Sequence, residues 1–185
     1  MTIAPNQPTT ALDVPAKDYA EALAQFAALQ ARDGDDVNPL CRSQLLTHGQ
    51  RSARAIVLIH GMTNCPHQFV QFAPLLYERG FNVLIPRMLH NGLLDRNTTA
   101  LSKVTAEELA TYGTQVSNIA CGLGERVLVA GISAGGNIAG WVAQFRPEVD
   151  SAILIAPSFG IVPPLRIGNA TANRLAGGLL RLLPN

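Results

Sequence analysis

A serine between two glycines is the part of this sequence best suited to chemistry. Residues 131–135 read Gly-Ile-Ser-Ala-Gly, which is the pattern G-x-S-x-G, between a short apolar run and a helix-like segment. A hydroxyl is a weak nucleophile unless a base activates it, and a sharp strand-to-helix turn that exposes it leaves room only for small neighbours. The pattern indicates Ser133 as a nucleophile for acyl transfer, although the same serine could simply cap a helix in a glycine-rich turn.

A second segment, His60-Gly61-Met62, also follows an apolar run, and Pro66 opens a helix-like segment after it. At such a strand end the backbone can direct an N–H group across the top of a sheet. The negative charge that develops on a substrate carbonyl during acyl transfer needs two N–H donors, and one normally comes from the residue after the nucleophile. We expect Ala134 to give that N–H and Met62 to give the other.

Alternating strand-like and helix-like segments must position these residues. The strand-like segments are short and rich in Val, Ile and Leu, as in strands buried on both faces, whereas the helix-like ones show helical spacing, caps and terminal Gly or Pro. We expect strands at 53–59, 81–85, 126–130 and 151–156, and helices at 18–32, 66–79, 105–120 and 134–145. This order predicts an α/β fold with a parallel sheet and helical crossovers, in which ligands bind at the carboxyl ends of the strands.

Over residues 53–157 the two motifs, in this order, resemble the α/β-hydrolase superfamily, in particular serine esterases and monoacylglycerol-lipase-like carboxylesterases. The resemblance implies a mostly parallel sheet with helices on both faces. It also implies that Ser133 is the catalytic nucleophile. Met62 and Ala134 would then be the backbone donors of the oxyanion hole, and His60 an orienting residue of the oxyanion loop.

The catalytic acid and base of that family are missing from this sequence. The resemblance implies that an Asp or Glu and then a His follow the nucleophile, but no His follows Ser133. Glu148 and Asp150 precede the strand at 151–156 and therefore belong to the wrong edge of the sheet. We expect this chain to be the first part of a longer hydrolase, incomplete at its C-terminus. A naturally short chain without full activity, and recruitment of an upstream histidine, are the alternatives.

All four histidines precede the nucleophile, and none has the features of a base. We interpret His60 as packed in its loop with hydrogen bonds to the backbone, and His67 and His90 as loop or rim residues. His48 belongs to no motif. The loop at 86–92 looks like the P-x-x-x-G-H-G segment of the same family, with two of its positions altered.

These features predict a serine hydrolase that cleaves carboxylic esters through an acyl-enzyme on Ser133, with a small-molecule ester carrying an apolar acyl group as its substrate. Neither a cofactor nor a metal is expected. A non-catalytic binding module on the same scaffold is the alternative from another class. A thioesterase, amidase or haloperoxidase would use the same serine, and the oligomeric state stays open.

Composition narrows the class of protein further. Hydrophobic residues make up 48% of the chain and charged residues 15%, with a net charge of +1, so a disordered chain is excluded. The 14 Lys and Arg against 13 Asp and Glu give no basic excess for binding nucleic acid. No apolar run approaches the roughly 18 residues of a membrane span. The first ten residues lack the features of a secretory signal, so we expect a cytoplasmic location.

The cysteines and the chain organisation complete the expectations. Cys41, Cys65 and Cys121 are odd in number, far apart and without a CxxC pair, so free thiols are expected rather than a disulfide or a zinc site. We divide the chain into an N-terminal arm and helix at 1–40, the first part of an α/β-hydrolase core at 41–157, and the start of a helical cap at 158–185. A further helix is expected at 173–183.

Overall fold

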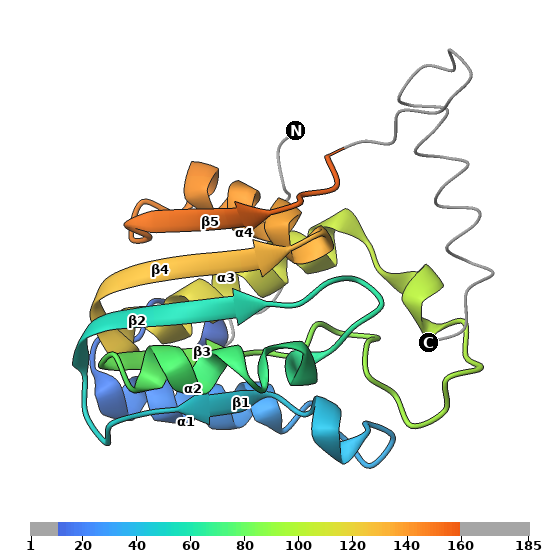
Figure 1. Cartoon of the computed structure of the whole chain (residues 1–185), viewed down its shortest axis with the longest axis horizontal. Helices are drawn as coiled ribbons and strands as arrows, with labels where there is room; N and C mark the ends of the chain where they lie inside the picture. The colour runs from blue at the N-terminus through green and yellow to red at the C-terminus, as the bar shows by residue number, and fades with distance from the viewer. Residues whose placement is uncertain (1–10, 160–185) are drawn as a thin grey trace.

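A computed structural model describes residues 11–159, and a five-stranded sheet forms their centre (Figure 1). The strands lie in the order β1-β3-β2-β4-β5; β1 is antiparallel to β3, and the other neighbours are parallel. Their bounds are Gln44–Leu46 for β1, Ser52–Ile59 for β2, Phe81–Ile85 for β3, Gly124–Ile132 for β4 and Ser151–Ile155 for β5. The predicted, mostly parallel α/β sheet is confirmed.

Helices connect the parallel strands. The α-helices are α1 (Tyr19–Gln30), α2 (Phe72–Tyr77), α3 (Ala106–Leu123) and α4 (Ala134–Phe145), and the short 3-10 helices are η1 (Ala11–Asp13), η2 (Pro39–Cys41), η3 (Pro66–Phe69) and η4 (Ala100–Lys103). Two of the α-helices begin with the caps that the sequence suggests: Asp18 accepts from the backbone of Glu21, and Thr105 forms a reciprocal capping box with Glu108. The helix predicted at 173–183 lies outside the described residues.

Alternating side chains of the central strands build two hydrophobic layers. Ala55, Val57 and Ile59 of β2 point into the layer that α1, α3 and α4 cover, whereas Ile56 and Leu58 point into the layer that η3 and α2 cover. All five residues are at most 3% exposed. Strands buried on both faces read as unbroken apolar runs, which is why β2 could be found from the sequence.

One predicted helix, at 66–79, is wrong as a single element. The segment forms η3 and then α2, with a break before Phe72. Pro74 lies in this segment and has no N–H to donate to an earlier carbonyl, so it is tolerated only in the first turn of a helix. The helix therefore restarts at Phe72, which places Pro74 in the first turn of α2.

Two further differences concern the ends of elements. The strand β1 was not predicted, since three residues are too few for a periodic pattern. Helix α3 continues to Leu123, beyond the predicted end at residue 120, and contains Gly122. A Cβ on Gly122 would lie 2.8 Å from Ala22 Cβ and 2.9 Å from Ala16 Cβ, so this glycine allows α3 to approach α1 and the segment before it.

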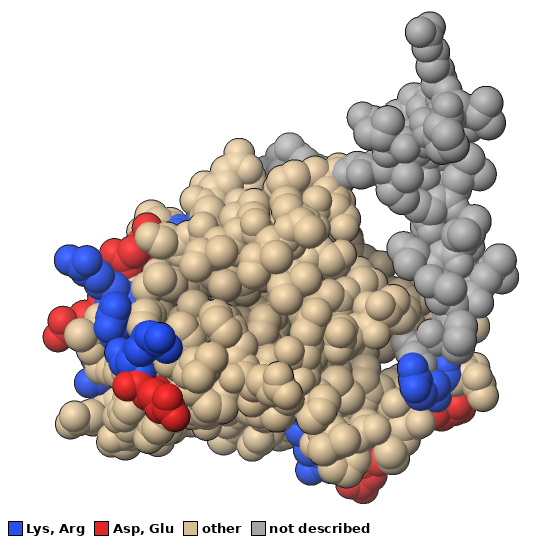
Figure 2. Space-filling model, in the orientation of Figure 1, with Lys and Arg blue, Asp and Glu red and all other residues tan. Residues whose placement is uncertain are grey.

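The edge strand β5 presents apolar side chains on the described surface. Ile153 is 47% exposed and Ile155 is 45% exposed. In Figure 2, the charged side chains on this face lie at the left margin and along the lower right, and other residue types form the surface between them. No helix within residues 11–159 combines the length and apolarity that crossing a bilayer requires.

Candidate active site

Ser133 lies between the end of β4 and the start of α4. Figure 1 shows this turn at the carboxyl end of the parallel strands. Its backbone has φ 56° and ψ −115°, in the positive-φ region that side chains with a Cβ rarely adopt. Such strained backbone persists only where the surroundings enforce it, and it gathers at functional sites. Here the strain is that of a sharp strand-to-helix turn that projects the serine side chain beyond the sheet.

The two glycines of the motif give this turn its room. A Cβ on Gly131 would collide with the backbone carbonyl oxygen of Gly135. A Cβ on Gly135 would in turn collide with the carbonyl oxygen of Ile59 and lie 2.6 Å from that of His60, at the end of β2. Any larger residue at either position would push α4 away from the sheet and open the turn.

Further contacts hold Ser133 against the end of β5. Its N–H donates to Ile155 O at 2.9 Å, and its Oγ lies 3.1 Å from Oγ of Ser158. Asn137 Nδ2 donates to Ser158 O at 2.9 Å. Sequence reasoning missed Ser158, because nothing in the spacing of 25 residues indicates that the two hydroxyls meet.

The predicted oxyanion loop lies beside this serine. A Cβ on Gly61 would be 3.7 Å from Ser133 Cβ. The carbonyl oxygen of Gly61 accepts from Asn64 N at 3.0 Å and bonds Nδ1 of His60 at 2.8 Å. That oxygen and the N–H of Met62 belong to one planar peptide unit, so fixing the first also fixes the direction of the second.

The second predicted donor, Ala134, is the first residue of α4. The N–H groups in the first turn of a helix have no acceptor within the helix, and the helix dipole places partial positive charge there. The structure therefore brings Ser133, Met62 and Ala134 to one edge of the sheet, where two adjacent strands end.

His60 is fully buried beneath the predicted oxyanion loop, and both of its ring nitrogens have partners. Nδ1 bonds Gly61 O, and Nε2 accepts from Met88 N at 3.1 Å, which requires a neutral ring with its proton on Nδ1. Burial lowers the pKa of His60 from 6.5 to about 4; the bond to Gly61 opposes this shift, and the charge of Arg87 adds to it. The ring has no nitrogen left to serve Ser133 as a base.

The other histidines lie elsewhere. The ring of His48 stacks on Tyr77 with centroids 4.1 Å apart, and the backbone N–H of His48 donates to Asn82 Oδ1. This contact lies near the amino end of β3, at the edge of the sheet opposite to Ser133. His90 pairs with Glu108 at 3.3 Å, and His67 is exposed on η3. Among the described residues, the hydrogen-bond partner of the Ser133 hydroxyl is another serine and not a histidine.

Comparison with known proteins decides the family. Residues 56–184 match the profile described as the alpha/beta hydrolase family. This chain belongs to the alpha/beta hydrolase family. Among curated proteins no sequence matches the chain. The resemblance drawn from the two motifs is thus confirmed at the level of family and fold.

Solved structures with the same fold include hydrolases of several kinds. One comes from a study of LipS and LipT, two metagenome-derived lipolytic enzymes, with 21% identity, a TM-score of 0.51 and coverage of 61% of this chain and 44% of that one. Est1E from Butyrivibrio proteoclasticus, with ferulic acid bound, shares 18% identity at a TM-score of 0.51, over 69% of this chain and 56% of that one. The thioesterase domain from the curacin biosynthetic pathway shares 21% identity at a TM-score of 0.51, over 78% of this chain and 50% of that one. The chain spans about half the length of these structures.

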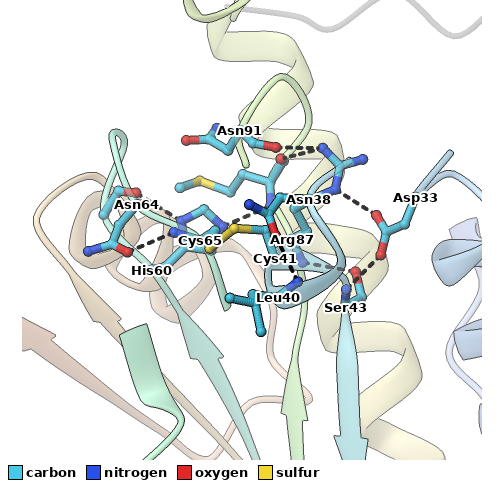
Figure 3. The surroundings of a disulfide bond; sticks show 12 residues. Asp33, Asn38, Leu40, Cys41, Ser43, His60, Asn64, Cys65, Arg87 and Asn91 are labelled. Atoms are coloured by element: carbon cyan, nitrogen blue, oxygen red, sulfur yellow. Dashed lines mark hydrogen bonds and ion pairs between the residues drawn. A yellow bond between two sulfur atoms is a disulfide. The ribbon is translucent and has the colours of Figure 1, made fainter. Parts of the chain in front are cut away.

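A disulfide in this family member corrects the prediction of three free thiols. Cys41 and Cys65 form a disulfide with their Cα atoms 5.2 Å apart, and Cys121 is free. Figure 3 shows the pair beyond the ends of the strands, in the same region as His60. The prediction was wrong because it relied on spacing along the chain. The fold brings together two loops that are 24 residues apart in the sequence.

A buried ion pair lies in the same region and was also missed. Arg87 Nε donates to Asp33 Oδ1 at 2.6 Å, and the two side chains are 4% and 3% exposed. Asp33 also accepts from Ser43 N, and the guanidinium of Arg87 donates to the carbonyl oxygens of Met88 and Asn91 (Figure 3). A charge buried in this way is tolerated because it is paired and hydrogen-bonded. The pair fastens the segment after α1 to the loop after β3. In the described part of the chain, no three His, Cys, Asp or Glu side chains gather as metal ligands.

Proposed function

We propose that the protein is a serine hydrolase that cleaves carboxylic esters, with Ser133 as its nucleophile. Ser133 Oγ would attack the ester carbonyl carbon, the alcohol would leave, and water would then hydrolyse the acyl-enzyme. The observation that carries this proposal is the positive φ of Ser133 between β4 and α4. The turn is so tight that Gly131 and Gly135, on either side, have no room for a Cβ.

The oxyanion of the tetrahedral intermediate would accept hydrogen bonds from the N–H groups of Met62 and Ala134. Donors fixed before the reaction begins stabilise developing charge without reorganising, and removal of one such donor costs roughly 10²–10³ in kcat in a well-studied protease. His60 would act as a positioning residue, because it holds the carbonyl of the peptide unit that carries the Met62 N–H. We assign no general base among the described residues, because there the hydroxyl of Ser133 contacts Ser158 and not a histidine.

The substrate class rests on the neighbours in fold. The likeness to a structure from a study of lipolytic enzymes and to Est1E, which holds ferulic acid, favours a carboxylic ester as substrate. An apolar acyl group fits the likeness to the lipolytic enzymes. The thioesterase domain, whose match covers 78% of this chain, favours a thioester as the second candidate. Ser133 and the two N–H donors would serve either substrate, because both reactions pass through a tetrahedral oxyanion.

The disulfide bears on the compartment in which the protein would act. A cytoplasmic location stays a prediction, but Cys41–Cys65 weighs against it, because cytosolic thiol systems keep most cysteines reduced. A disulfide persists more readily in a periplasmic or extracellular setting.

A fluorophosphonate probe on the full-length protein tests the nucleophile. We expect one covalent adduct, mapped by mass spectrometry to Ser133, and no adduct in Ser133→Ala. Ser158→Ala is the matched control, because it removes the hydroxyl 3.1 Å away and should keep the adduct. An adduct that persists in Ser133→Ala would refute the assignment. Absence of any adduct in the wild-type protein would favour the non-catalytic binding module.

A further inference from the structure

The disulfide joins two loops of which one carries a proposed oxyanion donor. Cys41 ends η2, and Cys65 closes the turn that begins at Gly61 and includes Met62. A third loop packs on the bond, because a Cβ on Gly92 would lie 2.6 Å from Cys41 Cβ and 3.2 Å from Cys65 Cβ. Glycine at this position lets the loop after β3 lie directly against the disulfide.

A short path of hydrogen bonds runs from Cys65 to the oxyanion donor. The backbone N–H of Cys65 donates to Asn64 Oδ1 at 2.9 Å, and Asn64 N donates to Gly61 O at 3.0 Å. Gly61 O shares a planar peptide unit with the N–H of Met62. The position of Cys65 therefore bears on the direction of that N–H through one turn of backbone.

The segment around Cys41, the other cysteine of the disulfide, is held by several hydrogen bonds. Cys41 N donates to Asn38 O at 2.8 Å, and Asn38 N donates to Gly92 O at 2.9 Å. Two residues beyond Cys41, Ser43 donates its N–H to Asp33 and accepts at Oγ from Arg87 N, so the buried ion pair holds this segment as well. The disulfide thus ties the exposed turn at Met62 to a segment with many buried contacts.

We propose that the Cys41–Cys65 disulfide is a positioning element for the oxyanion hole, so that its reduction by thiols lowers the turnover rate. This inference rests on the function proposed above. In the reduction, a dithiol such as dithiothreitol gives two electrons and two protons to the cystine. Cys41 and Cys65 become thiols, and the dithiol becomes a cyclic disulfide. Cys65 is buried and Cys41 is half-buried, so Cys41 is the more exposed of the two cysteines that the reductant must reach.

The effect should fall on kcat and not on KM. The oxyanion donor acts on charge that develops in the transition state, so loss of its alignment leaves ground-state binding unchanged. We expect reduction to lower kcat by at least ~10-fold, short of the roughly 10²–10³ cost of deleting a donor. If the disulfide were purely structural, its reduction would lower the melting temperature but leave the kcat of the folded protein at room temperature unchanged.

The test compares oxidised and reduced full-length protein with a chromogenic ester, after fluorophosphonate labelling has established that Ser133 reacts. Wild type and Cys121→Ser should both lose kcat on reduction and recover it on reoxidation, since burial raises the pKa of the Cys121 thiol to about 11 and its removal leaves the disulfide intact. The double variant Cys41→Ala/Cys65→Ala should have the same low kcat with and without the reductant. Unchanged kcat in fully reduced wild-type protein, with complete thiol alkylation shown by mass, would overturn the inference.

Amide hydrogen exchange separates this inference from the proposed function. We expect the amides of residues 61–65 to exchange faster in the reduced protein, whether or not the protein is an esterase. If oxidised Ser133 does not react with the probe, the proposed function fails while faster exchange still supports the positioning role. Unchanged exchange in this turn would refute that role by itself.

Discussion

Replacement of His60 by glutamine should remove a pH dependence that this buried ring gives to the stability of the fold. The ring is fully buried and neutral, and burial lowers its pKa from 6.5 to about 4. In the unfolded chain the same imidazole titrates near its ordinary pKa of about 6.5. Between these two pKa values the imidazole binds a proton in the unfolded state but not in the folded state, so the free energy of unfolding falls as the pH falls.

The magnitude follows from the size of the shift. Each pKa unit corresponds to about 1.4 kcal/mol, so a shift from 6.5 to about 4 is equivalent to about 3 kcal/mol. The contribution of a neutral His60 is fully present above pH 6.5 and is lost progressively down to about pH 4. Protonation at Nε2 would also place two donors face to face, because that nitrogen accepts from Met88 N.

Urea unfolding at pH 7, 6, 5 and 4 measures this effect. The decline in unfolding free energy from pH 7 to 4 should be about 3 kcal/mol smaller in His60→Gln than in wild type. The absolute stability of the variant will differ through its lost hydrogen bonds, so the slope is the readout. His48→Gln, at an exposed position on the opposite edge, is the matched control and should follow wild type. Parallel curves for wild type and His60→Gln would refute the reasoning.

Two further substitutions test the packing around the site by urea unfolding at pH 7. Gly135→Ala should destabilise the fold by about 3 kcal/mol, because its Cβ meets the fixed backbone at the end of β2, whereas Gly140→Ala on the same helix meets a flexible leucine side chain and should be near neutral. Equal stabilities of these two variants would contradict the tight-turn argument. Asp33→Asn should cost about 3–5 kcal/mol, because it leaves the buried guanidinium of Arg87 without a counter-charge, while the exposed Asp35→Asn should cost little. A small loss in Asp33→Asn would contradict the view that Asp33 is the counter-charge that Arg87 needs.

Much of the fold could be predicted because its elements carry local signals. Helix α4 begins and ends where the sequence suggests, since a glycine-rich turn precedes it and Pro147 follows its last residues. Strands β2 and β4 are buried on both faces and read as apolar runs. The errors arose where a local signal was weak or was overridden by packing. Strand β1 is too short to show a pattern, and α3 extends to Leu123, past its predicted end at residue 120, with Gly122 at a close contact between helices.

The surroundings of the candidate site were much harder to foresee. Cys41 and Cys65 are 24 residues apart, and Asp33 and Arg87 are 54 residues apart, so neither pair has a spacing that any single element would explain. Both pairs depend on how the segment after α1 crosses the carboxyl ends of β2 and β3. Single-sequence patterns describe elements, whereas these contacts are made by the loops between elements, where chain direction is set by the assembled core.

The meeting of the two motifs follows from sheet register more than from either motif. Ile59 of β2 pairs with Gly131 of β4, so the two parallel strands end level with each other. Two residues further along each chain, Gly61 and Ser133 must then face one another, and a Cβ on Gly61 would lie 3.7 Å from Ser133 Cβ. The sequence could place each motif at a strand end, but it could not show that β2 is the neighbour of β4, because β3 intervenes along the chain and lies on the other side of β2. A shift of this register would separate the proposed nucleophile from the proposed oxyanion loop without altering a residue of either. The apolar contacts that fix β2 against β4 are therefore as necessary to the candidate site as the serine itself.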